Sequence, residues 1–190
     1  MNIQAALVRS ILEQWPSYTW TVQGLGMLRT KIADVGRIHV WDSSLRVPQV
    51  SDAHSHPWDL HSTVISGELI NQRFGIVKES NLRYTRQRLH CGEGGGLVAD
   101  TREDVCLSVF PLEFYTPGDF YKQAKDEIHR SIPQDGTVTL MERQLIEGEC
   151  QEAWVLWPRG TEWVSAEPRL AKQAEIQQAV AHALARWSAA

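Results

Sequence analysis

The chain has 190 residues, a formal net charge of −4 and a hydrophobic content of 43%. This length suits one domain that buries a core of its own without covalent staples. No basic excess points to nucleic acid or an anionic membrane as the main partner.

The cysteines and the lengths of the apolar runs indicate the cellular compartment of the protein. The three cysteines, an odd number, are widely separated in the sequence, which argues against a disulfide framework. The first 17 residues lack the apolar run and cleavage site of a signal peptide. No apolar stretch approaches the roughly 18 residues that a membrane span needs. We therefore expect a cytoplasmic protein without a membrane partner.

In chain order, helical spacing of apolar residues predicts a short amphipathic helix over residues 3–15. From about residue 20 to 165 the pattern changes to short strand-like runs separated by Gly, Pro, Asn and Asp. The glycine-rich residues 91–96 suggest a flexible hairpin loop. A second helix is expected from Pro168 to about residue 187, because proline suits a first helical turn. The strand-like runs are 36–42, 61–70, 72–77, 82–89, 106–109, 138–143 and 153–157. A turn is expected at Gly67.

This pattern predicts one all-β domain over residues 1–190, a sandwich or barrel with a helix at each end. The second helix carries an apolar stripe that would pack against the barrel or against a second subunit, so a homodimer is one expectation. The stripe consists of Ile176, Val180, Leu184 and Trp187.

Histidines supply the most informative motif. His54 and His56 stand two apart, and in an extended strand such residues point to the same side. Imidazole is a common protein ligand of Zn, Fe, Cu and Ni. His129 lies far enough downstream for intervening strands to return the chain to the same place. Three neutral imidazoles leave a divalent ion its full charge and open coordination positions.

Two segments containing these histidines resemble the signature stretches of the cupin superfamily. They are HSHPWDLHSTVISGEL, which starts at His54, and YTPGDFYKQAKDEIHRSI, which contains Pro117, Gly118 and His129. The resemblance covers roughly residues 36–158. It implies a cupin-type jelly-roll β-barrel with one divalent transition metal on the three histidines.

Within the superfamily, the chain resembles thiol dioxygenases of the cysteine dioxygenase type, and also small bacterial and phage cupins of unassigned function. The first likeness implies Fe(II) as the favoured metal, with Zn, Ni or Mn as alternatives, and O₂ and a small substrate as ligands. Arg29 stands about where those enzymes keep an arginine for the substrate carboxylate, a role that its guanidinium suits. Tyr121 could flank the site, although packing is the simpler role.

The chain also departs from these families. The usual cupin glutamate is absent, and its place falls near Leu60 or His61. Asp59 is a possible fourth ligand or a partner of a metal-bound histidine. The thiol dioxygenases carry a histidine and a tyrosine beyond the third ligand, whereas here Met141 or Glu142 stands near that place.

These departures leave three functions open. The first is a dioxygenase-like enzyme, with Arg29, Tyr121 and Glu142 as candidate substrate-binding residues. The second is a cupin that binds or senses a small ligand without turnover. The third is a metal-dependent isomerase or hydrolase that uses Glu142 or Glu127 as its base.

Overall fold

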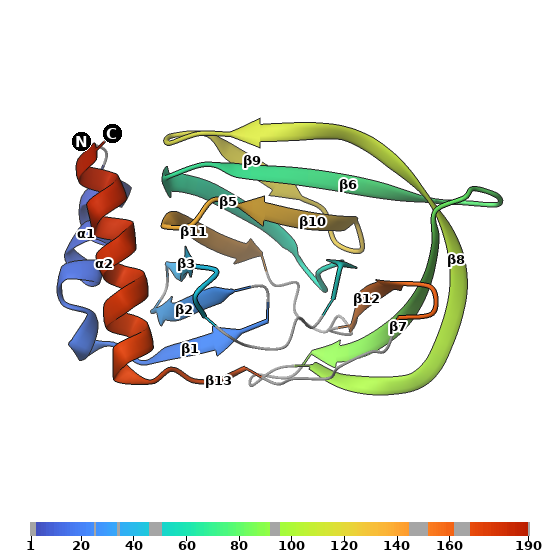
Figure 1. The fold of residues 1–190 in the computed structure, drawn as a ribbon, viewed down its shortest axis with the longest axis horizontal. Coiled ribbons are helices and arrows are strands. Elements are labelled where there is room, and N and C mark those ends of the chain that lie inside the picture. The colour runs from blue at the N-terminus through green and yellow to red at the C-terminus, as the bar shows by residue number, and fades with distance from the viewer. Residues whose placement is uncertain are drawn as a thin grey trace.

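A computed structural model describes residues 3–24, 26–33, 35–45, 51–91, 96–144, 152–161 and 168–189. The strands form a seven-stranded sheet and a closed six-stranded barrel, and all of their pairings are antiparallel (Figure 1). In spatial order the sheet contains β13 (Arg169–Leu170), β1 (Trp20–Gln23), β2 (Met27–Ile32), β3 (Gly36–Trp41), β11 (Thr137–Gln144), β5 (Asp59–Ser66) and β9 (Phe120–Gln123). The barrel contains β10 (Ile128–Pro133), β4 (Ala53–His54), β12 (Glu152–Pro158), β7 (Arg83–Cys91), β8 (Gly96–Tyr115) and β6 (Leu69–Val77). The helices are α1 (Ile3–Glu13) and α2 (Gln173–Ala189), with a short 3-10 turn at Trp15–Ser17.

The architecture confirms the predicted all-β class, the barrel and the helices near both ends. It is compatible with a cupin-like jelly roll. Strands β7 and β8 pair up to Cys91 and Gly96, while residues 92–95 of the predicted hairpin loop lie outside the described residues.

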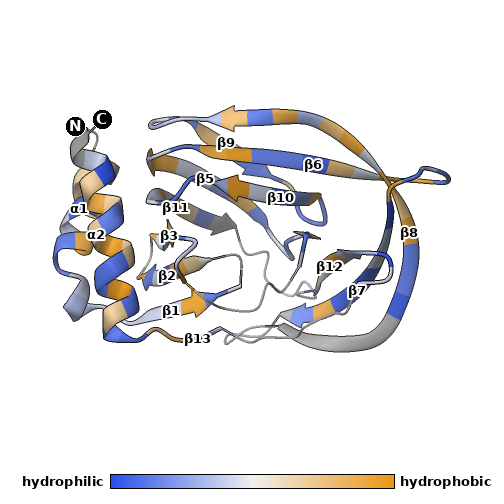
Figure 2. Cartoon of the chain, viewed as in Figure 1, coloured by the Kyte–Doolittle hydropathy of each residue, from blue (hydrophilic) through white to orange (hydrophobic). Residues whose placement is uncertain are grey.

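Both helices cover one face of the seven-stranded sheet (Figure 1). Alternation along the strands sends every second side chain to that face, where Leu28, Ile38 and Val40 are fully buried. Each such side chain contributes roughly 1.5–3 kcal/mol on burial. Figure 2 shows the mixture of apolar and polar residues along α2. The whole predicted stripe of α2 packs into this core, so the helix lies on the sheet of its own chain.

Helix α2 begins at Gln173 rather than at Pro168. Arg169 and Leu170 instead pair with Val22 and Thr21 of β1, because sheet hydrogen bonds compete with the helix for their backbone groups. The carboxylate of Glu175 then accepts a hydrogen bond from the backbone N–H of Lys172 at 2.8 Å, which caps the new helix start. No helix in the described part of the chain is long and apolar enough to cross a membrane.

The opposite face of the seven-stranded sheet carries a row of polar side chains. Arg29 of β2, His39 of β3 and Thr139 of β11 are direct neighbours in one cross-strand row. Alternation along β3 puts Arg37, His39 and Trp41 on this same face, since Ile38 and Val40 are in the helix-covered core.

Gly67 forms the turn from β5 to β6 with φ of +80°, a conformation that favours glycine. A Cβ there would lie 2.8 Å from the Cα of Thr137, which is closer than carbon atoms can approach. We expect Gly67→Ala to lower the free energy of unfolding by about 3 kcal/mol or more, through backbone strain plus this clash.

Gly118→Ala is the matched control, because Gly118 also has a positive φ of +96° but nothing lies within 4 Å of its Cβ position. It should cost only the backbone strain, about 1–2 kcal/mol. Urea unfolding of both variants measures the difference. Equal losses of stability in the two variants would mean that the clash with Thr137 adds nothing to the backbone strain.

Candidate metal centre

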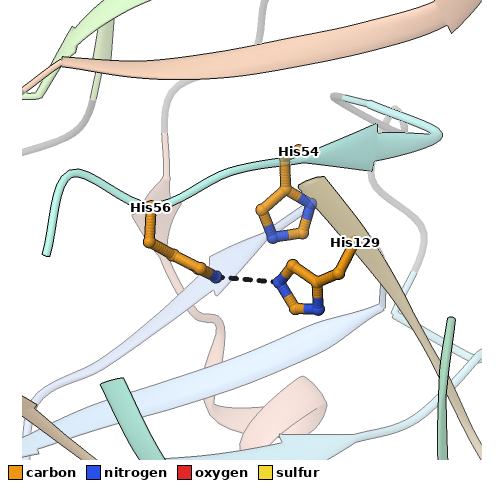
Figure 3. Close-up of side chains that lie close together, drawn as sticks. All are labelled: His54, His56 and His129. Carbon is orange, nitrogen blue, oxygen red and sulfur yellow. Dashed lines mark hydrogen bonds between the residues drawn. The ribbon is translucent and has the colours of Figure 1, made fainter. Parts of the chain in front are cut away.

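Strand pairing brings the predicted histidines together. His54 on β4 and His129 on β10 are direct cross-strand partners. His56 follows two residues after His54, and its ring lies on the same side of the chain (Figure 3). Two segments far apart in the sequence therefore supply three imidazoles to one point.

The three rings are close enough to share one ion. One potential ligand nitrogen from each of His54, His56 and His129 lies within 4.8 Å of the others. The Nε2 atoms of His56 and His129 are 3.0 Å apart, and the three rings point toward one another in Figure 3. Ring centroids are separated by 4.8 to 5.1 Å. Of the described residues, only these three form a group of potential metal ligands.

Burial keeps these rings neutral. It lowers the pKa of His54 to about 4. Burial, with the neighbouring histidines as a further cause, holds the pKa values of His56 and His129 well below the usual value of 6.5. Neutral imidazole is the form that binds a metal, so the cluster is ready to coordinate one at neutral pH.

His129 has a well-defined partner on its other ring nitrogen. Its Nδ1 lies 2.7 Å from Oδ1 of Asn71 on β6, and Asn71 is fully buried. A hydrogen bond of this kind orients a metal-binding imidazole and leaves Nε2 to face the ion. His54 has a weaker contact, 3.5 Å from its Nδ1 to Oγ of Ser51.

Two residues of β3, on the face of the seven-stranded sheet away from the helices, adjoin the cluster. Arg37 and His39 both act electrostatically on His56. Burial, together with the charges of Arg29 and Arg37, lowers the pKa of His39 to about 3, so this ring is neutral. The Arg37 guanidinium lies 5.8 Å from the ring centre of Trp58, which is itself 6.3 Å from the ring of His56.

Arg29 is held in place by its neighbours. Its Nη1 donates to Oε1 of Gln23 at 2.6 Å, and its Nε donates to Oγ1 of Thr21 at 3.1 Å. Burial lowers its pKa to about 10, with the nearby Arg37 as a second cause. The group still carries its charge at neutral pH, in surroundings where an anion would be attracted strongly.

The other candidate ligands lie apart from the histidines. Asp59 is exposed, and its Oδ1 accepts a hydrogen bond from the backbone N–H of Lys125 at 2.7 Å. His61 lies on the opposite face of β5 from the buried Leu60, as strand parity requires. Neither residue belongs to the grouped ligands.

Neither candidate base belongs to the group of potential metal ligands. Glu142 is exposed and lies opposite His61 on the neighbouring strand, on the face away from Met141. Glu127 accepts a hydrogen bond of 2.5 Å from Nη1 of Arg73, so its carboxylate is engaged in an ion pair. These placements give the isomerase or hydrolase alternative little support.

Tyr121 is buried between the two sheets. Its hydroxyl is hydrogen-bonded to Ser62 of β5 and Ser131 of β10, and its ring lies 4.8 Å from that of Tyr115. These contacts fit the packing role weighed for it, since the tyrosine joins an apolar cluster with Leu60 and Met141.

Sequence reasoning missed Asn71 and did not connect Arg37 or His39 to the histidines. Strand alternation gave a signal for the last two, because it placed them on one polar face. Asn71 gave none, since its contact with His129 depends on how β6 and β10 pair.

The comparisons with known proteins add no relative. No family model, no curated protein and no solved structure matches this chain. The functional argument therefore depends on the barrel and on the residues that it brings together.

Proposed function

We propose that this protein is a cupin-like metalloprotein, in which His54, His56 and His129 hold one divalent transition metal, Fe(II) by preference. The observation that carries the proposal is the convergence of three neutral imidazoles within 4.8 Å. Such a donor set suits Fe, Zn, Ni or Mn, and the choice among them depends on availability as well as geometry. A bound ion would supply Lewis acidity and open positions for a substrate and a second reactant.

The proposed reaction class is dioxygenase-like chemistry on a small anionic molecule. Arg29 and Arg37 support an anionic substrate, because the positive charges of both guanidinium groups reach His39 beside the cluster and lower its pKa. Their role would be to bind and orient the anion, which holds the reacting groups in a productive geometry. The runner-up is a binding or sensing protein that uses the same residues without turnover.

Metal analysis and oxygen uptake test the proposal in sequence. Untagged protein is expected to contain, or to take up after Fe(II) addition, about one equivalent of transition metal. The loaded protein is then screened for O₂ consumption with small thiols and diketones. Binding without consumption, seen as ligand-induced stabilisation, would favour the non-catalytic alternative. Protein that contains no metal and takes up neither Fe(II) nor Zn(II) would contradict the metalloprotein proposal.

Arg29→Gln separates anion binding from metal binding. A hydrogen bond to a charged group contributes about 1.5–3 kcal/mol, so we expect small carboxylates to bind roughly 10- to 100-fold more weakly, with metal content unchanged. Arg159→Gln is the control, because Arg159 pairs with Asp104 at the surface, where both side chains are more than half exposed. Calorimetric titration of both variants with a carboxylate panel provides the measurement. Equal affinities in the two variants would exclude Arg29 as the anion-binding group.

A further inference from the structure

The carboxylate of Glu113 on β8 is linked to His129 through Asn71. Oε2 of Glu113 accepts a hydrogen bond from Nδ2 of Asn71 at 2.9 Å. It also accepts from Nε of Arg73 and from the hydroxyl of Tyr115, each at 3.1 Å. The other end of the Asn71 amide lies 2.7 Å from Nδ1 of His129. The amide thus joins the carboxylate to the ring.

Partial burial works to raise the pKa of Glu113, but the hydrogen bonds from Asn71, Arg73 and Tyr115 lower it below its usual value overall. The ionised carboxylate can only accept hydrogen bonds. The end of Asn71 that faces it must therefore be the NH₂ group, and the end that faces His129 must be the carbonyl oxygen. A carbonyl oxygen can only accept, so Nδ1 of His129 must carry the proton.

The contact between His56 and His129 fits the same assignment. Their Nε2 atoms are 3.0 Å apart, and a hydrogen bond between two nitrogens needs one proton. With Nδ1 of His129 protonated, Nε2 of that neutral ring is an acceptor. In the metal-free protein His56 then donates through Nε2, and a bound ion would take the place of that proton.

We propose that Glu113 and Asn71 are positioning residues that fix His129 in its Nδ1–H tautomer, so that its Nε2 lone pair faces the other two histidines. The role of this relay in metal binding rests on the proposed function, whereas the tautomer itself does not. Arg73 and Tyr115 support the relay by holding the carboxylate in place. The arrangement makes a partly exposed glutamate on β8 a determinant of affinity at a buried histidine on β10.

Nitrogen-15 chemical shifts of the histidine rings test the tautomer directly in chelator-treated protein. In the wild type at pH 7 we expect Nδ1–H for His129 and Nε2–H for His56. In Glu113→Leu, no acceptor is left for the Asn71 amide, which can then turn and present its NH₂ group to His129. We expect the Nε2–H form of His129 to appear, and Zn(II) affinity measured by chelator competition to fall about 10- to 100-fold.

Two further variants sharpen the test. Glu103→Leu makes the same chemical change on the same strand, where Glu103 pairs with Arg86 at the surface, and it should alter neither readout. Asn71→Leu removes the acceptor and should shift the tautomer as Glu113→Leu does. If this buried change prevents folding, Glu113→Leu still decides the question, because the Glu113 side chain is 35% exposed.

The outcomes separate this inference from the proposed function. Wild-type His129 in the Nε2–H form, or a Glu113→Leu variant with unchanged tautomer and affinity, would overturn the relay even if metal binds. The expected tautomers in a wild type that binds no metal would support the relay and overturn the proposed function.

Discussion

His129→Ala is expected to lower the affinity of the protein for Zn(II) or Fe(II) by more than about 100-fold. Loss of an outer hydrogen-bonding partner alone typically costs 10- to 100-fold, and loss of a ligand costs more. The side chain of His129 is nearly fully buried and contacts both Asn71 and His56, so the substitution also leaves the Asn71 oxygen without this partner. Chelator competition on purified protein measures the effect.

His61→Ala is the matched control for that loss. It removes a partly buried histidine from β5, but one that lies outside the grouped ligands. Its metal affinity should equal that of the wild type, and circular dichroism should show that both variants fold. If His129→Ala binds the metal as tightly as the wild type does, His129 is not a metal ligand.

The metal-free protein is expected to lose stability steeply as the pH falls below about 6.5. The folded pKa values of His39 and His54 are lowered to about 3 and about 4, and those of His56 and His129 also lie well below 6.5. Unfolding restores the ordinary value, so between these limits the unfolded chain binds more protons than the folded chain. The stabilising contribution is therefore complete above about pH 6.5 and is lost as the pH falls toward the folded values.

Each of these four histidines should cost about 1.4 kcal/mol per pH unit once the pH is below 6.5. From pH 7 to pH 5.5 we expect a combined loss of about 5 kcal/mol in the free energy of unfolding, measured with urea in the presence of a chelator.

His39→Gln should reduce this pH dependence by about a quarter, since it removes one of the four groups. His90→Gln serves as its control, because the His90 side chain is 55% exposed. A flat stability profile between pH 7 and pH 5.5 would show that these rings are not held neutral in the folded protein.

The sequence predicted the centre of the site because its signals are local or carried by a resemblance. The spacing of His54 and His56 follows from strand geometry, and the cupin signatures supplied His129. The sequence could not show which residues of distant strands lie opposite each other. The pairing of His54 with His129, and of His129 with Arg73, joins strands from distant parts of the chain. The contacts that link Asn71 and Glu113 to His129 depend on this strand pairing, so the sequence alone did not point to these two residues.

The fold was predictable in class and less so in detail. Short alternating runs indicated strands, but β8 extends from Gly96 to Tyr115, where only residues 106–109 had been expected. Its charged residues gave no alternation of polar and apolar positions, and pairing with β7 and β6 holds it in the extended form. Asp59 lay close to His56 in sequence, yet its carboxylate is bound to the backbone of Lys125.

The central claim is that three imidazoles hold one transition metal, and X-ray absorption spectroscopy of the Zn(II)-loaded protein tests it most directly. We expect a shell of nitrogen or oxygen ligands at about 2.0–2.1 Å, with the multiple-scattering pattern of three imidazoles. The same pattern should be absent in His129→Ala under identical loading. A sulfur shell near 2.3 Å, or a wild-type spectrum with no imidazole scattering, would contradict the account.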